Sequence, residues 1–254
     1  MTLTFKPDGL YIESQERPIA PAFPELTAAQ ELALLARILY REGYNDHLAG
    51  HITYRQPDGT FLVNPYGLVW GELQASDIMS MDGDGNLLGG KWTITPAILV
   101  HLELHRTRDV TVALHNHPEY GTLWADIGRA PEVYDQTGAF TNAKVAVYSE
   151  YEGAVDQVSN ARAVVDAMDD ADIALLAHHG VLIVGESIRQ IYLRATSFEW
   201  RCRQAYRVAA AGGGVPMDPD VAWRYGELFR GNDFSGMFEA MARQELRRDP
   251  EILH

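Results

Sequence analysis

A buried strand that ends in two histidines constrains the fold of this chain more than any other feature of its sequence. The apolar run 110–114 is followed directly by His115-Asn116-His117. Residues i and i+2 of a strand point to one face, so the imidazoles of His115 and His117 are expected to project side by side, with Asn116 turned away. Pro118 cannot donate to a sheet ladder and is expected to end the strand. The triplet alone fits either a pair of metal ligands or two histidines at a polar strand end.

A second apolar strand also ends in histidine. The run 173–176 is continuously apolar and is followed by Ala177-His178-His179-Gly180. Three imidazoles from two strand ends would leave metal positions open for water or substrate, as in a catalytic rather than a structural metal site. In a regular strand His178 and His179 point to opposite faces, so one of the two is expected to be a ligand. Gly180 would let another group approach the backbone closely.

Composition narrows the class of protein. The formal net charge of -14, without any basic stripe, argues against a nucleic-acid or anionic-membrane partner. The one cysteine, Cys202, excludes an internal disulfide. The sequence shows no N-terminal apolar signal region and no apolar run long enough to span a membrane. We therefore expect a cytoplasmic protein.

The predicted elements suggest one large domain with an arm and an extension. Residues 1–25 carry several prolines and no clean period, and they predict an N-terminal arm before a domain at 26–211 and a C-terminal helical extension at 212–254. The turn Gln56-Pro57-Asp58-Gly59 between two alternating runs predicts a hairpin. Apolar periodicity and capping residues predict the helices 28–42, 96–107, 159–168, 187–209 and 235–247 and the short strands 145–148 and 181–184.

Four short stretches occur in an order and at a spacing that are highly specific together. They are Leu48-Ala49-Gly50-His51-Ile52-Thr53, Asn64-Pro65-Tyr66-Gly67, His115-Asn116-His117, and His179-Gly180 after an apolar strand. Together they resemble the class II aldolase/adducin family over residues 28–211. The resemblance implies an α/β protein, with a three-layer α/β/α fold around a mixed, mostly antiparallel central sheet. It also implies a homotetramer with active sites near subunit interfaces.

The resemblance further implies one divalent metal ion per subunit. Its ligands would be His115, His117 and His179. Zinc is the first expectation, while manganese, iron and cobalt also suit three imidazoles.

One departure from the family concerns the acid/base residue of its aldolases. By register on His101, Ala97 stands where those enzymes carry a glutamate early in the helix. Glu103 follows about one and a half turns later and cannot occupy the same place. His101 and His105 share a helix face, and we expect packing or supporting roles for them rather than metal binding. The chain thus resembles most closely the members that lack the glutamate, which include decarboxylases of aromatic or ring-cleavage acids and an iron-dependent oxygenase acting on aryl-pyruvates.

A second departure concerns phosphate binding. Sugar-phosphate members cradle the phosphate with small polar groups and backbone amides, whereas here a bulkier histidine and a proline without an amide donor stand at the equivalent positions. We therefore expect a small acid substrate without a phosphate. His51 would bind a carboxylate or a phenolate of this substrate, or would simply bond within its loop. The resemblance places substrate binding on Gly50, His51, Asn64, Gly67 and Thr95.

These features predict a divalent-metal-dependent carbon–carbon lyase of the decarboxylase or retro-aldol type. It would act on a non-phosphorylated keto or hydroxy acid through a metal-stabilised enolate. Decarboxylation needs an electron sink but no base to start bond cleavage, so it tolerates the loss of the glutamate better than aldol cleavage does. Tyr134 lies where the family often brings an aromatic residue across a subunit interface, and it is either the catalytic proton donor or a packing residue. The alternatives are a non-haem iron oxygenase on an aryl-keto acid and a non-catalytic scaffold of the adducin-head kind.

Overall fold

The computed structural model describes residues 21–150, 153, 157–230 and 236–254. The N-terminal arm predicted for residues 1–25 therefore lies outside the described residues up to residue 20. Within the described part of the chain, no helix is both long enough and apolar enough to cross a membrane.

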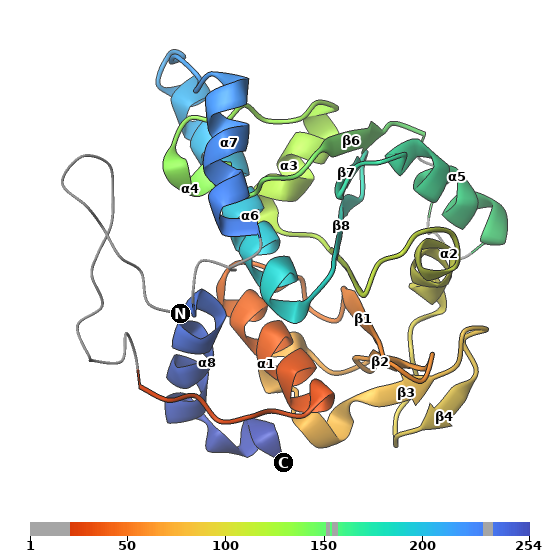
Figure 1. Cartoon of the computed structure of the whole chain (residues 1–254). Helices are drawn as coiled ribbons and strands as arrows, with labels where there is room; N and C mark the ends of the chain where they lie inside the picture. The colour runs from red at the N-terminus through yellow and green to blue at the C-terminus, as the bar shows by residue number, and fades with distance from the viewer. Residues whose placement is uncertain (1–20, 151–152, 154–156, 231–235) are drawn as a thin grey trace.

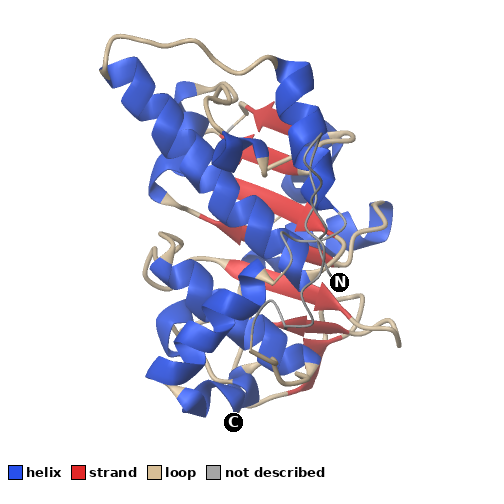
Figure 2. Ribbon diagram, turned by 60° about the vertical axis from the view of Figure 1, so that its left-hand side comes forward, coloured by secondary structure: helices blue, strands red, loops and turns tan. Residues whose placement is uncertain are grey.

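A mixed sheet forms the centre of the fold (Figure 2). Among the described residues it has eight strands, in the order β4-β3-β2-β1-β5-β8-β7-β6. Neighbouring strands are antiparallel except β6 and β7, which are parallel. The prediction of a mixed, mostly antiparallel sheet is therefore confirmed. The strands are β1 (His51–Arg55), β2 (Phe61–Val63), β3 (Met79–Met81), β4 (Leu87–Gly89), β5 (Val112–Asn116), β6 (Val145–Tyr148), β7 (Ile173–Leu176) and β8 (Gly180–Gly185).

Helices cover both faces of this sheet, which confirms the predicted three layers (Figure 1). Alternate side chains of each strand point to opposite faces. Leu114 and Ile183 face a core shared with α1, α3, α6 and α8, while Ala113 and Leu182 face a second core shared with α2 and α5. The helices are α1 (Ala28–Arg41), α2 (Leu99–Thr107), α3 (Glu119–Ile127), α4 (Gln136–Ala139), α5 (Val158–Met168), α6 (Ile188–Ala210), α7 (Pro219–Arg230) and α8 (Met237–Arg248).

The ends of α1 follow from its sequence. Thr27 is the N-cap: its hydroxyl accepts a hydrogen bond from the Gln30 amide, and the Gln30 side chain accepts one from the Thr27 amide. This reciprocal capping box satisfies two amides that the first helical turn leaves without partners. Gly43 follows the C-cap at φ 102°, a conformation that glycine adopts at little cost. The predicted start and end of this helix are confirmed.

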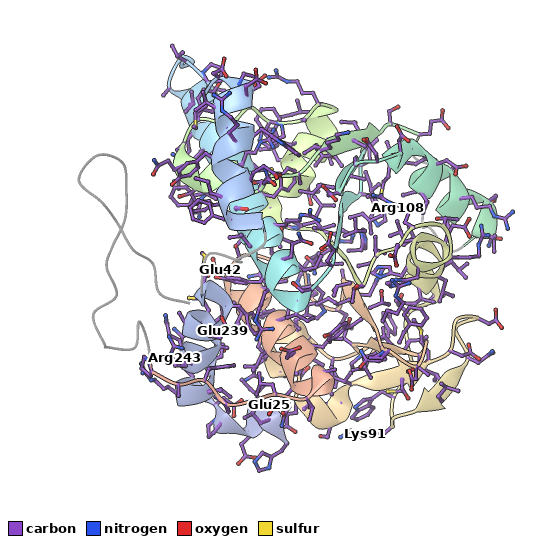
Figure 3. All side chains as sticks on the ribbon, viewed as in Figure 1. Glu25, Glu42, Lys91, Arg108, Glu239 and Arg243 are labelled. Carbon is purple, nitrogen blue, oxygen red and sulfur yellow. The ribbon has the colours of Figure 1, made fainter. Side chains whose placement is uncertain are left out.

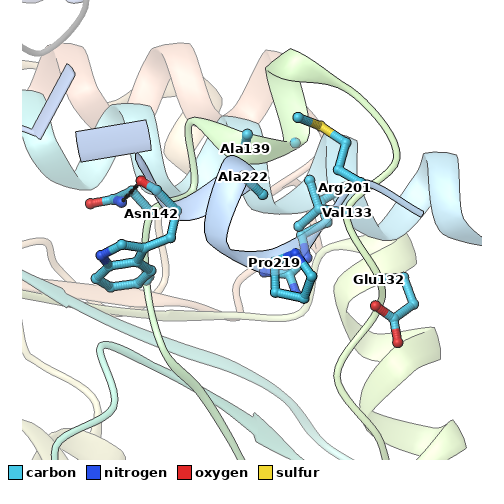
Figure 4. Close-up of a pocket in the computed structure, with 11 residues that line it drawn as sticks. Glu132, Val133, Ala139, Asn142, Arg201, Pro219 and Ala222 are labelled. Carbon is cyan, nitrogen blue, oxygen red and sulfur yellow. Dashed lines mark hydrogen bonds between the residues drawn. The ribbon is translucent and has the colours of Figure 1, made fainter. Parts of the chain in front are cut away.

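Three helices, α3, α4 and α7, are absent from the elements that the sequence pattern predicts. Each contains a glycine, which lowers helix propensity. In α7 the glycine has a packing reason: a Cβ at Gly226 would lie 2.5 Å from the Ala139 carbonyl oxygen. Close packing on α4 therefore overrides local propensity. The helices α4 and α7 and the side of α6 border a pocket of about 570 Å³, lined among others by Asn142, Arg201 and Trp223 (Figure 4).

The helix α8 packs against α1 at the end of the chain (Figure 1). Its Phe238 and Ala242 belong to the same core as the apolar face of α1. Two ion pairs lie across this contact, between Arg37 and Asp249 and between Arg41 and Glu245. A third pair joins Arg189 of α6 to Glu239, which lies on the side of α8 seen in Figure 3. A short 3-10 helix follows α8 at Pro250–Leu253, and the described residues contain three others, at Trp70–Glu72, Ala75–Asp77 and Pro96–Ile98.

Candidate metal centre

The two histidines at the end of β5 converge as the strand period predicts. His115 belongs to the strand and His117 follows it by two residues, so both rings lie on the α2 face of the sheet. Their Nε2 atoms are 3.2 Å apart. Asn116 points to the opposite face, where its Oδ1 accepts a hydrogen bond from the His117 amide and its Nδ2 donates to the Ala49 carbonyl. The asparagine therefore fixes the backbone that carries the pair.

His179 reaches the same place from the turn between β7 and β8. The strand ends at Leu176, and the chain reverses with His178 in the left-handed region at φ 57°. The strand ends where the apolar run ends, and the turn that follows brings one of the two histidines to the pair. The His179 ring centroid lies 4.6 Å from that of His115 and 4.9 Å from that of His117. His178 instead turns outward, with its Nδ1 3.8 Å from an oxygen of Asp126.

Gly180 makes the approach of the two strand ends possible. A Cβ at this position would lie 2.5 Å from Cδ2 of His117 and 2.6 Å from the Asn116 carbonyl oxygen. No larger residue fits without moving the histidine or the backbone beside it. The predicted close approach at this glycine is confirmed, and the group that approaches is one of the candidate ligands.

Outer partners orient two of the three rings. The Nδ1–H of His115 donates to the Val181 carbonyl at 2.9 Å, and the Nδ1–H of His117 donates to Asp46 Oδ2 at 2.8 Å. In its neutral form, a ring that donates through Nδ1 has a free lone pair on Nε2, the atom that would bind a metal. A carboxylate or a carbonyl behind a histidine is the usual arrangement around a protein-bound metal. Asp46 is a functional candidate that the sequence does not single out, because it lies in an irregular loop far from the histidines along the chain.

The donor set fits a divalent metal ion. The three histidines offer ligand nitrogens that all lie within 4.8 Å of one another. Burial lowers the pKa of His115 well below its ordinary value, and burial lowers the pKa of His179 to about 4. Both rings are therefore neutral at neutral pH, the form in which imidazole binds a metal. Three nitrogen ligands would leave further coordination positions for water or substrate.

A small cavity adjoins the candidate ligands and includes the position of the missing glutamate. It is lined by His51, Ala97, Val100, His115, Leu176 and His179. Ala97 contributes only a methyl group to this wall. Glu103 forms its ion pair with Arg106 at the exposed side of α2. The structure thus places no carboxylate from this helix among the cavity residues.

His51 is the cross-strand neighbour of His115 in the register of β1 and β5. Its ring centroid lies 4.9 Å from that of His115, and the side chain is buried. Its Nδ1 is 2.7 Å from Nε2 of His101, so the ring is held from the side of α2. Of the predicted substrate-binding residues, His51 is the one that lines the cavity.

The other predicted substrate-binding residues shape the loops around the cavity. Asn64 accepts a hydrogen bond from the Ile52 amide and donates to the carbonyls of Gly50 and Pro65. Gly50 adopts φ 103°, and a Cβ there would lie 2.1 Å from the side-chain Nδ2 of Asn116. Thr95 caps the 3-10 helix Pro96–Ile98 by accepting from the Ala97 amide. Gly67 adopts φ 95° in an exposed turn.

Tyr134, the candidate proton donor, lies away from this cavity in its own chain. It is located between α3 and α4, and a Cβ on Gly214 would lie 3.5 Å from its ring. The larger pocket of Figure 4 borders the same segment through Glu132 and Val133 and contains none of the three candidate ligands. We therefore regard the histidine cluster, rather than the larger pocket, as the candidate active site.

Comparison with known proteins shows the family to which the chain is related. The model of the class II aldolase and adducin N-terminal domain matches residues 30–206, which include all three candidate ligands. The chain belongs to the class II aldolase and adducin family. An L-fuculose 1-phosphate aldolase from Glaciozyma antarctica has the same fold, with a TM-score of 0.77 and 23% identity over 91% of this chain and 96% of that one.

Three relatives illustrate the range of activities named within the family. An adducin-related protein of Schizosaccharomyces pombe is 31% identical over 66% of this chain, and the match spans 55% of that longer protein. A 4-hydroxy-3-prenylphenylpyruvate oxygenase/4-hydroxy-3-prenylbenzoate synthase of Streptomyces roseochromogenus is 28% identical over 87% of this chain and 82% of its own length. A protein of Streptomyces niveus named as a decarboxylase is 27% identical over 87% and 84% of the two chains.

Proposed function

We propose that this protein is a divalent-metal-dependent carbon–carbon lyase, of the decarboxylase or retro-aldol type, acting on a small non-phosphorylated keto or hydroxy acid. The observation that carries the proposal is the cavity that His115 and His179, two members of the histidine triad, line together with Ala97. The metal ligands are present, and the carboxylate of the family's aldolases is missing. We propose zinc as the metal and a homotetramer as the assembly.

The chemistry of the site follows from its donor set. A divalent cation held by the three histidines would act as a Lewis acid and stabilise negative charge on a substrate oxygen. Asp46 and the Val181 carbonyl would keep the ligand nitrogens of His117 and His115 unprotonated and aimed at that cation. The remaining wall, with Ala97, Val100 and Leu176, is apolar and would exclude water from the carbon chain of the substrate.

The absence of a carboxylate at position 97 favours decarboxylation over ordinary aldol cleavage. Aldol cleavage requires a base that removes a proton from a hydroxyl before the carbon–carbon bond breaks, and Ala97 cannot do so. Loss of carbon dioxide needs only the stabilised charge at the start and a proton donor afterwards. One of the two relatives reported above that match 87% of the chain is named a decarboxylase, which supports the same choice. The other is named an oxygenase, which is the alternative considered below.

The absence of a phosphate is inferred from the same cavity. His51 fills the wall with a ring, and Pro96 provides no backbone amide beside Thr95. A phosphate dianion needs several converging donors, which these residues do not supply. We therefore propose that the acid group bound by the metal is the only strongly charged group of the substrate at this cavity.

Proton transfer to the product requires a further residue. We propose Tyr134 for this role, acting on the cavity of a neighbouring subunit. Tyr134 does not line the cavity of its own chain and lies beside Gly214, so the role depends on the tetramer. Light scattering of the purified protein tests the tetramer, and Tyr134→Phe tests the hydroxyl.

Metal analysis combined with substitution tests the central proposal. We expect one zinc ion per chain in the wild type, loss of zinc and of activity on a panel of 2-keto and 2-hydroxy acids in His117→Ala, and retention of both in His178→Ala. His178 is the matched control, because it follows the same strand but faces outward. Wild-type protein without bound metal, or His117→Ala with unchanged properties, would support a scaffold instead. Activity that strictly requires dioxygen and iron would support an oxygenase.

A further inference from the structure

A line of buried polar groups runs from the cavity into the protein behind it. His51 Nδ1 lies 2.7 Å from His101 Nε2, and His101 Nδ1 lies 2.8 Å from the Thr53 hydroxyl. The same hydroxyl lies 2.7 Å from His105 Nε2, and His105 Nδ1 lies 3.1 Å from the Val110 carbonyl. The four side chains alternate between β1 and α2, and each is at most 9% exposed. We call them the histidine relay.

The far end of the histidine relay fixes the direction of every hydrogen bond in it. The Val110 carbonyl can only accept, so His105 Nδ1 carries a hydrogen and donates. Burial lowers the pKa of His105 to about 4, so its other nitrogen, Nε2, is unprotonated at neutral pH. The Thr53 hydroxyl must then donate to His105 and accept from His101 Nδ1–H.

The same reasoning continues to the cavity. With its hydrogen on Nδ1, neutral His101 accepts at Nε2, and the donor is the Nδ1–H of His51. Neutral His51 then has no hydrogen on Nε2. Because Nδ1 of His51 is engaged by His101, Nε2 is the nitrogen left for the cavity that His51 lines with Ala97 and His115.

We propose that the histidine relay sets the specificity of the site: it holds the substrate-facing nitrogen of His51 as a hydrogen-bond acceptor, so the site takes a metal-bound acid that presents a hydroxyl donor to His51. His51 is the residue that touches substrate, while His101, Thr53 and His105 are positioning residues. This inference rests on the proposed function, because it needs a small acid at the histidine triad.

The relay decides between the two ligands that the sequence leaves open for His51. A carboxylate or a phenolate oxygen carries lone pairs only and would face the lone pair of Nε2, an arrangement that disfavours binding. A 2-hydroxyl or an enol hydroxyl donates and matches the acceptor. The substrate class is therefore narrowed from keto or hydroxy acids to acids that bear a hydroxyl at the metal-binding end.

A neutron diffraction map of the zinc-loaded wild-type protein tests the hydrogen positions directly and needs no variant. The expected map has deuterium on Nδ1 of His51, His101 and His105 and none on Nε2 of His51. Deuterium on Nε2 of His51 would overturn the proposal, whatever the activity of the protein.

Calorimetry of the zinc-loaded protein with L-lactate and pyruvate tests the consequence for binding, because these acids differ by a hydroxyl donor. Thr53→Val removes the relay hydroxyl, whereas Thr53→Ser keeps it and serves as the matched control. We expect Thr53→Val to weaken L-lactate binding about tenfold, which corresponds to the net contribution of one buried hydrogen bond. Pyruvate binding should not weaken. Thr53→Ser should restore L-lactate affinity. Equal losses for both acids, or no rescue by serine, would contradict the relay.

The two measurements also separate this inference from the proposed function. If wild-type protein binds no zinc or neither acid, the proposed function fails, and a neutron map of the metal-free protein still decides the tautomer of His51. If zinc and both acids bind, but the ratio of L-lactate to pyruvate affinity is the same in the wild type and in Thr53→Val, the proposed function stands and the inference about the histidine relay fails.

Discussion

Asp46→Asn should weaken zinc binding while leaving the fold intact. Asp46 accepts the Nδ1–H of His117 at 2.8 Å, and this hydrogen bond is the first cause of the lowered pKa of the Asp46 carboxyl. Asparagine keeps the shape and can still accept that hydrogen, but it removes the negative charge that makes the imidazole a stronger ligand.

The structure sets the size of this effect. Loss of such an outer partner typically costs about 10- to 100-fold in metal affinity. The Asp46 side chain is 41% exposed, so water screens its charge and the lower end applies. We therefore expect zinc affinity to fall about tenfold, which corresponds to about 1.4 kcal/mol.

Competition with a chromophoric chelator at a fixed neutral pH measures this change. Asp126→Asn is the matched control, because Asp126 is also a partly exposed aspartate facing a histidine, His178, which is not a candidate ligand. The control should leave zinc affinity unchanged. If Asp46→Asn binds zinc as tightly as the wild type, the carboxylate does not tune His117 and our reading of the outer partners is wrong.

Three further predictions follow from single positions. Gly180→Ala should reduce zinc affinity and should lower the free energy of unfolding by about 1–3 kcal/mol, because the new Cβ would meet His117. Gly83→Ala is the control in thermal unfolding, because a Cβ at that position meets nothing within 4 Å. Glu199 accepts hydrogen bonds from the Tyr120 and Gly121 amides, and burial raises its pKa from the ordinary range of a glutamate to about 7. Its protonated form thus favours folding, and this contribution is lost as pH rises through that range. Glu199→Gln should flatten the accompanying fall in Tm, and an unaltered slope would count against this assignment. Ala97→Glu should lower the Tm of metal-free protein, since the new carboxylate would be partly buried against the apolar side chains of the cavity. Zinc should raise the Tm of this variant more than that of the wild type, and an equal zinc response would show that position 97 does not face the metal.

Much of the site could be predicted from the sequence because its geometry follows from strand periodicity. The period of two places His115 and His117 on one face, and the same rule places His51 and Thr53 on the matching face of the neighbouring strand. The apolar runs also predict several of the strands and most of the helices, while the mixed central sheet is what the family resemblance implies. Where a strand carries the side chain, a local rule is sufficient to give its direction.

The parts that the sequence leaves undetermined depend on contacts between distant segments. His178 and His179 leave the strand in a turn that no period describes, and only the fold shows which of them joins the site. Asp46 lies in a loop whose position is fixed by its neighbours in space. The roles of His101 and His105 require the direction of a hydrogen-bond network that crosses from α2 to β1.

The two departures at the cavity, an alanine at position 97 and a histidine at position 51, have one electrostatic consequence. Both residues face the same small space, and neither carries charge there: Ala97 has no ionisable group, and burial lowers the pKa of His51 well below its ordinary value. A divalent cation bound through three imidazole nitrogens would keep its full charge toward the cavity, with the carboxylate of Asp46 behind His117. A glutamate at position 97 would reduce that charge. The site of this chain is thus more attractive to an anionic acid than a glutamate-bearing site would be, and its neutral acceptor at His51 would then select, among anionic acids, those that carry a hydroxyl.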